Sequence, residues 1–69
     1  MNEKKYIRAV TSSQKNEIME RLLAVWEAYP QLRLGQLLGN AELNQVVLYN
    51  TEDYDLIEHL EKFYAARLS

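Results

Sequence analysis

Tyr-Pro-Gln-Leu-Arg-Leu-Gly-Gln-Leu-Leu-Gly-Asn, residues 29–40, is the stretch that decides the fold of this 69-residue chain. It holds the only proline and both glycines of the sequence. Pro30 lacks an amide hydrogen and disfavours a helical conformation at the residue before it, so a preceding helix should end near residue 28. Leucines then recur at helical spacing, and Gly39 followed by Asn40 is typical of a helix that closes with a left-handed residue. The stretch therefore predicts a short helix over about 31–39.

Gly35 is the unusual residue of this short helix. A glycine in the middle of a helix costs about 0.5–1 kcal/mol relative to alanine. The cost is best explained if another group packs closely against the glycine. Trp26 is the candidate ring, because it lies about one turn before the end of the preceding helix.

The residues upstream predict a long amphipathic helix over about 12–28. Thr11 and Gln14 have the spacing of a capping box, in which each residue bonds the backbone of the other. Apolar residues then recur at helical spacing: Ile18, Leu22, Val25, Trp26 and Tyr29. Residues 1–10 alternate only loosely between polar and apolar, so we expect an edge strand or an extension there.

Downstream, residues 46–49 read Val-Val-Leu-Tyr, a β-branched and aromatic run that is typical of a short extended segment. Residues 6–10 are the only other candidate strand that could pair with it. Asn50 and Thr51 are cap candidates for a last helix over about 51–67. This helix has acidic residues in its first turn and Lys62 and Arg67 in its last turns, as the helix dipole favours.

Together these segments predict one small, mainly α-helical domain that spans residues 1–69. The expected architecture is a compact bundle of three helices, at about 12–28, 31–39 and 51–67, with a short extended segment at 46–49. A domain of this size buries only about 60% of the surface that its unfolded chain exposes. Self-association is a common source of additional stability for such domains, so we expect a homodimer.

The composition excludes several kinds of site. The chain has no cysteine, and its single histidine, His59, cannot build a zinc site without further ligands. No apolar run approaches the roughly 20 residues needed to cross a bilayer. The net charge is −2, without a basic run of the kind that binds nucleic acid. We therefore expect a soluble, cytoplasmic protein with no metal or other cofactor and no membrane or nucleic-acid partner.

The candidate binding residues lie on and around the short second helix. Arg33, Gln36 and Asn40 are spaced i, i+3 and i+7, which places a guanidinium and two amides along one helix face. Such a row suits a carboxylate, a phosphate or a base edge. Alternatively, Arg33 pairs with an acid of the last helix and the two amides hold the turn backbone. Three aromatic residues flank the row and complete the candidate surface: Trp26, Tyr29 and Tyr49.

These residues favour a small non-enzymatic interaction or regulatory module that acts on a protein partner. No nucleophile and base can be paired, since Ser12 and Ser13 are cap candidates without a neighbouring base. One alternative is a small-molecule binder that holds an anionic nucleotide between two subunits, through Arg33, Gln36, Asn40 and stacked Tyr or Trp rings. A helix-turn-helix over residues 32–48 is a weaker alternative, because its recognition helix would carry no Lys or Arg.

The chain resembles a group of very small uncharacterised bacterial and phage proteins. The resemblance covers about residues 14–64 and rests on Trp26, Pro30 and the sequence Leu-Arg-Leu-Gly-Gln-Leu-Leu at 32–38, followed by Asn40, Tyr49 and Asp53. That group has no assigned activity, so the resemblance implies only a stand-alone accessory protein encoded by a phage or prophage. It singles out six positions: Trp26, Arg33, Gly35, Gln36, Asn40 and Asp53.

Overall fold

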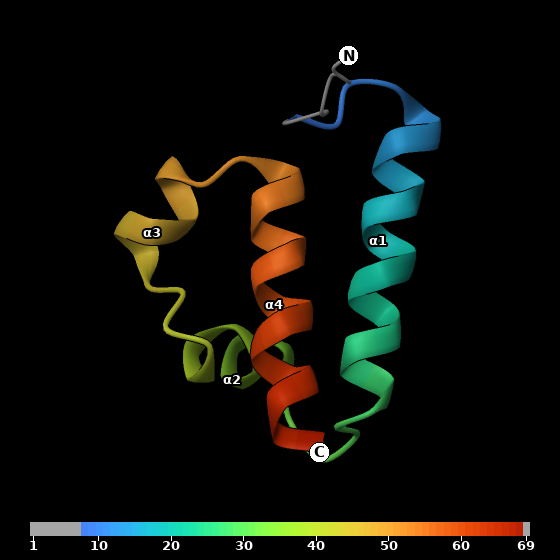
Figure 1. The fold of residues 1–69 in the computed structure, drawn as a ribbon. Helices are drawn as coiled ribbons and strands as arrows, with labels where there is room; N and C mark the ends of the chain where they lie inside the picture. The colour runs from blue at the N-terminus through green and yellow to red at the C-terminus, as the bar shows by residue number, and fades with distance from the viewer. Residues whose placement is uncertain (1–7, 69) are drawn as a thin grey trace.

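The computed structural model describes residues 8–68, and this part of the chain forms four α-helices (Figure 1). They are α1 (Ser12–Glu27), α2 (Leu34–Asn40), α3 (Gln45–Asn50) and α4 (Asp53–Leu68). The prediction of a small, mainly helical bundle is confirmed, with four helices in place of the expected three. Within residues 8–68, no helix has the length and apolar character that crossing a bilayer requires.

The helix α1 begins and ends as the sequence predicts. The Gln14 amide donates to Thr11 Oγ1 at 3.1 Å, and Gln14 Oε1 accepts from the Thr11 amide at 2.9 Å. Both halves of the capping box are therefore present. The helix ends at Glu27, and Ala28 is its cap residue, two positions before Pro30.

The prediction of an extended segment at residues 46–49 is wrong, because these residues lie inside α3. Asn44 begins this helix, because its Oδ1 accepts a hydrogen bond from the Val47 amide at 3.0 Å. β-Branched residues favour strands chiefly through packing on a pleated neighbour. Residues 8–68 contain no strand that could supply one, and residues 6 and 7 of the expected partner strand lie outside the described residues.

The start of the last helix also differs from the prediction, in which Asn50 and Thr51 are its cap residues. Asn50 is the last residue of α3, and Thr51 is the cap residue at its C-terminal end. The last helix therefore begins at Asp53 instead of near residue 51. Glu52 occupies the cap position, since its carbonyl accepts from the Leu56 amide at 2.8 Å.

The end of α2 is closed by Glu42 and not by the predicted pair Gly39-Asn40. Neither glycine of the chain has a positive φ, whereas Glu42 has φ 65°. The Leu43 amide donates to the Leu38 carbonyl at 3.1 Å, and the Glu42 amide donates to the Gly39 carbonyl at 2.9 Å. This pair of bonds is the Schellman motif, in which the left-handed residue follows the helix.

The predicted contact between Gly35 and Trp26 is also wrong. A β-carbon on Gly35 would meet no atom within 4 Å. The Trp26 indole instead donates from Nε1 to the Leu32 carbonyl at 2.7 Å, which braces the turn between α1 and α2. Packing within the described part of the chain therefore does not explain the glycine.

The two long helices lie side by side and run in the same direction (Figure 1). The chain returns from the end of α1 to the start of α4 through α2 and α3, and α3 lies on the side of α4 away from α1. The buried core contains six residues from α2, α4 and the link after α2: Leu37, Ala41, Leu43, Ile57, Leu60 and Tyr64. No residue of α1 is fully buried, so this helix covers α4 without being covered in turn.

The residues before α1 are bonded to the start of α4. The Arg8 guanidinium donates to both carboxylate oxygens of Glu52, at 3.1 and 3.0 Å. The Ala9 amide donates to Asp53 Oδ2 at 2.8 Å, and Ala9 is buried. Asp53, one of the positions singled out by the resemblance, thus has a structural partner.

A candidate binding groove and an adjoining pocket

The structure divides the predicted row on α2 between the two ends of that helix. Arg33 is the N-cap residue, and its backbone amide donates to Gln36 Oε1 at 2.8 Å. Asn40 is the last of the seven residues of α2 and lies at the opposite end. Within residues 8–68 the Arg33 guanidinium forms no ion pair, so the alternative pairing with an acid of the last helix is wrong.

The three aromatic candidates lie in different environments. Trp26 is half-buried and bonds the Leu32 carbonyl at the turn after α1. Tyr29 is half-buried, and its hydroxyl donates to the Tyr64 carbonyl at 3.1 Å. Tyr49 is 89% exposed on α3. The structure therefore does not gather the six predicted residues into one surface, and their role in binding stays a prediction.

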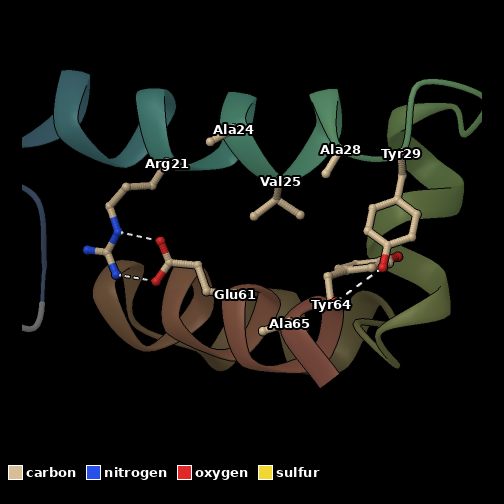
Figure 2. Close-up of a pocket in the computed structure, with 8 residues that line it drawn as sticks. All are labelled: Arg21, Ala24, Val25, Ala28, Tyr29, Glu61, Tyr64 and Ala65. Atoms are coloured by element: carbon tan, nitrogen blue, oxygen red, sulfur yellow. Dashed lines mark hydrogen bonds and ion pairs between the residues drawn. The ribbon is translucent and has the colours of Figure 1, made fainter. Parts of the chain in front are cut away.

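A groove of about 240 Å³ runs between α1 and α4 (Figure 2). Three of its lining residues, Ala24, Ala28 and Ala65, are exposed alanines, and Val25 lies between the two helices. Alanine side chains leave the backbones of both helices close to the surface. The groove is thus an apolar channel whose walls allow another chain to approach closely.

One end of the groove is closed by an ion pair between the two helices. Arg21 donates from Nε to Glu61 Oε2 at 2.8 Å and from Nη2 to Glu61 Oε1 at 2.6 Å (Figure 2). The hydrogen bond from Arg21 lowers the pKa of Glu61, and the hydrogen bond to Glu61 raises the pKa of Arg21. Glu17, one turn before Arg21, lies farther away, at 4.0 Å from the guanidinium. The bidentate geometry fixes the spacing of α1 and α4 here.

The other end of the groove is closed by two tyrosines. The rings of Tyr29 and Tyr64 have centroids 4.7 Å apart and are tilted by 55°. Tyr64 is buried, its hydroxyl donates to the Leu37 carbonyl, and burial raises the pKa of its phenol. At neutral pH Tyr64 is therefore a neutral donor that links α4 to α2.

Two acidic side chains that do not line the groove lie next to one of its lining residues on α1, on a surface that we call the rim. Glu20 precedes Ala24 by four residues and Glu27 follows it by three, so both are neighbours of Ala24 on the helix surface. Both are exposed, and within residues 8–68 neither carboxylate takes part in an ion pair. The rim of α1 thus carries negative charge that no described cation neutralises.

A second hollow of about 440 Å³ lies beyond the two tyrosines. Its seven lining residues come from the turn after α1, the end of α2 and the last turns of α4: Tyr29, Gln31, Leu32, Asn40, Phe63, Tyr64 and Arg67. The Arg67 guanidinium lies 3.7 Å from the centroid of the Phe63 ring. Of the predicted residues, the structure brings Tyr29 and Asn40 together here, with Arg67 as the cation in place of Arg33.

The sequence-based reasoning missed the alanines of the groove and Arg67. Ala24 and Ala28 have helical i, i+4 spacing, which is a signal for close packing of another chain against α1. Arg67 was explained by the helix dipole alone, and nothing in the sequence places it beside Asn40. Among the described residues, no group of three or more acidic or histidine side chains lies close enough together to hold a metal ion.

No protein-family model matches this chain, and neither a curated protein nor a solved structure is similar enough to count as a match.

Proposed function

We propose that this protein is a non-enzymatic interaction module that binds a helical segment of a protein partner in the groove between α1 and α4. The observation that carries this proposal is an apolar channel with exposed alanines on both walls, held open by the Arg21–Glu61 ion pair and the two tyrosines. An amphipathic helix that lays its apolar face into such a groove is a common mode of peptide recognition. The alanines permit the close approach that this mode requires.

The charge of the rim specifies the chemistry of the partner helix. Because Glu20 and Glu27 have no described ion-pair partner, a segment with Lys or Arg beside its apolar row would neutralise them. The expected partner is therefore a different protein with a basic amphipathic helix.

This proposal can be tested by selecting binders from random peptides of about 16 residues displayed on yeast. We expect enrichment of peptides with an apolar row at helical spacing and a net positive charge. The substitution Ala28→Gln fills the groove without changing its charge and should weaken the enriched peptides by at least about tenfold, the equivalent of 1.4 kcal/mol. The measurement is a binding titration of purified protein against each enriched peptide.

The matched control is Ala66→Gln, which adds the same side chain to an exposed alanine of α4 that does not line the groove. Peptide affinity should remain at the wild-type value in this variant. The proposal is wrong if no peptide class is enriched, or if the two alanine variants lose affinity equally.

We also propose that the protein forms a homodimer through the flank of α1 opposite the groove. Met19 and Leu23 are spaced i, i+4 there and are 57% and 51% exposed. Burying them against a second copy would add to the small core of this chain. Light scattering after size-exclusion chromatography should give twice the monomer mass for wild type and the monomer mass for Leu23→Glu.

The control for the homodimer is Val46→Glu, which places a charge on an exposed apolar residue of α3. This variant should remain a dimer, and a monomeric wild type at about 0.1 mM would rule the interface out. The resemblance of residues 14–64 supports the proposal of a phage or prophage accessory protein, and the lack of a long apolar run in the sequence supports a cytoplasmic location.

A further inference from the structure

The pocket beyond the two tyrosines carries a positive charge in a chain whose net charge is negative. Among residues 8–68 its lining contains one cation, Arg67, and no acidic residue. Within residues 8–68 Arg67 forms no ion pair, and its nearest hydrogen-bond acceptor is the Phe63 carbonyl at the long distance of 3.4 Å. Most of the guanidinium donors therefore have no partner among the described residues and can bind an anion.

The guanidinium of Arg67 is held in position by an aromatic cluster. It stacks 3.7 Å above the Phe63 ring, and Phe63 in turn packs edge-on against Tyr64 with centroids 4.9 Å apart. Tyr29 packs on the same Tyr64 ring. An arginine that is stacked in this way loses less freedom when it forms hydrogen bonds with a carboxylate or phosphate.

The other walls of the pocket suit a ligand larger than an inorganic ion. Asn40 and Gln31 are exposed and supply amide donors and acceptors, and Tyr29 supplies an aromatic wall. The volume of about 440 Å³ falls within the range of roughly 300–1,000 Å³ that is usual for small-molecule sites.

We propose that this pocket binds a nucleoside monophosphate, with the phosphate on Arg67 and the base against the aromatic wall. The amides of Asn40 and Gln31 would hydrogen-bond the base or the sugar. This site is separate from the groove proposed for a partner helix, because the groove lies on the other side of Tyr29 and Tyr64. Either proposal can therefore fail without the other.

The test is a titration of isotope-labelled protein with AMP, GMP, CMP and UMP, followed by the amide chemical shifts of Asn40, Phe63 and Arg67. At least one nucleotide should give saturable shifts with a Kd below about 1 mM. Adenosine and inorganic phosphate, each of which offers half of the contacts, should bind at least about tenfold more weakly than AMP if AMP is the ligand.

The substitution Arg67→Gln should weaken nucleotide binding by about tenfold or more, because it removes a charge-assisted hydrogen bond. Arg33→Gln is the matched control, since Arg33 is also exposed and without an ion pair among the described residues but lies outside the pocket. A thermal unfolding midpoint equal to that of the wild type would show that the Arg67→Gln variant is folded.

Three outcomes would overturn the nucleotide site. The first is the absence of saturable shifts with all four nucleotides up to about 10 mM. The second is an equal loss of affinity in Arg33→Gln and Arg67→Gln. The third is nucleoside binding as strong as that of the nucleotide, which would remove the role of the phosphate. None of these outcomes would affect peptide binding in the groove, which Ala28→Gln tests.

Discussion

Glu42 is the one non-glycine residue with a positive φ among the described residues. A left-handed conformation costs an L-residue about 1–2 kcal/mol, because the β-carbon comes close to the following carbonyl oxygen. Glu42 nevertheless has φ 65°, while both glycines of the chain lie at negative φ within α2. The Schellman bonds from Glu42 and Leu43 hold this conformation and end α2 so that Ala41 and Leu43 enter the core.

We expect Glu42→Gly to raise the free energy of unfolding by about 0.5–1 kcal/mol. Glycine adopts the left-handed conformation without steric cost, and this gain exceeds the additional flexibility that glycine gives the unfolded chain. Urea unfolding followed by circular dichroism measures the change. Glu42→Ala is the control, because it removes the same charge and keeps the β-carbon. Equal stabilisation by alanine and glycine would assign the effect to charge.

At the scale of the elements, α1 and α4 form the frame of the molecule, yet their contact is only partly buried. The apolar stripe of α1 is half-buried against α4, and none of its residues reaches full burial. The helices are parallel, so they cannot be joined by a short turn and depend on side-chain contacts to keep their spacing. The bidentate bond between Arg21 and Glu61 is the strongest polar contact between them.

The Arg21–Glu61 pair should make stability depend on pH under acidic conditions. Because the pKa of Glu61 is lowered in the folded state from its ordinary value of 4.5, its ionised form stabilises the fold above that pH. The stabilisation is lost as the pH falls from about 4.5 through the lowered pKa of the folded protein, because over this range the unfolded chain binds a proton that the folded carboxylate does not. The two side chains are 32% and 36% exposed, so we expect a contribution below about 1 kcal/mol.

Glu61→Gln should therefore reduce the loss of unfolding free energy between pH 5 and pH 3 relative to wild type. Urea titrations at pH 7, 5 and 3 measure this difference. Glu20→Gln is the control, because Glu20 has no ion-pair partner among the described residues and should follow the wild-type pH dependence. Identical pH profiles for wild type and Glu61→Gln would contradict a stabilising role for the pair.

At the scale of the whole molecule, the path of the chain decides which surfaces remain open. The return through α2 and α3 covers one side of α4, and the groove between α1 and α4 stays uncovered (Figures 1 and 2). The same path brings the turn after α1 together with the ends of α2 and α4, which forms the pocket with Arg67. The two hollows share Tyr29 and Tyr64, so variants of these tyrosines would disturb both and cannot separate the two proposals.

The sequence by itself determined the features that depend on neighbours within about four residues. The capping box of Thr11 and Gln14 and the end of α1 before Pro30 follow from hydrogen bonds and steric contacts along the local chain. The helical spacing of the apolar residues of α1 and the presence of a helix at residues 53–68 could be predicted because both depend on local sequence patterns. The β-branched run at residues 46–49 led to the wrong prediction of an extended segment, since the preference of such residues for strands depends on a neighbouring strand.

Only the tertiary structure decided the groove and the pocket. Arg21 meets Glu61 across 40 residues of sequence, and Tyr29 meets Tyr64 across 35. Asn40 and Arg67 line one pocket because α2 crosses near the end of α4. Helical periodicity states which residues share a face, but the pairing of faces depends on the parallel arrangement of α1 and α4. That arrangement depends on packing between residues distant in sequence, such as Leu22 of α1 against the core that contains Leu37 and Leu60, and no local pattern contains such a contact.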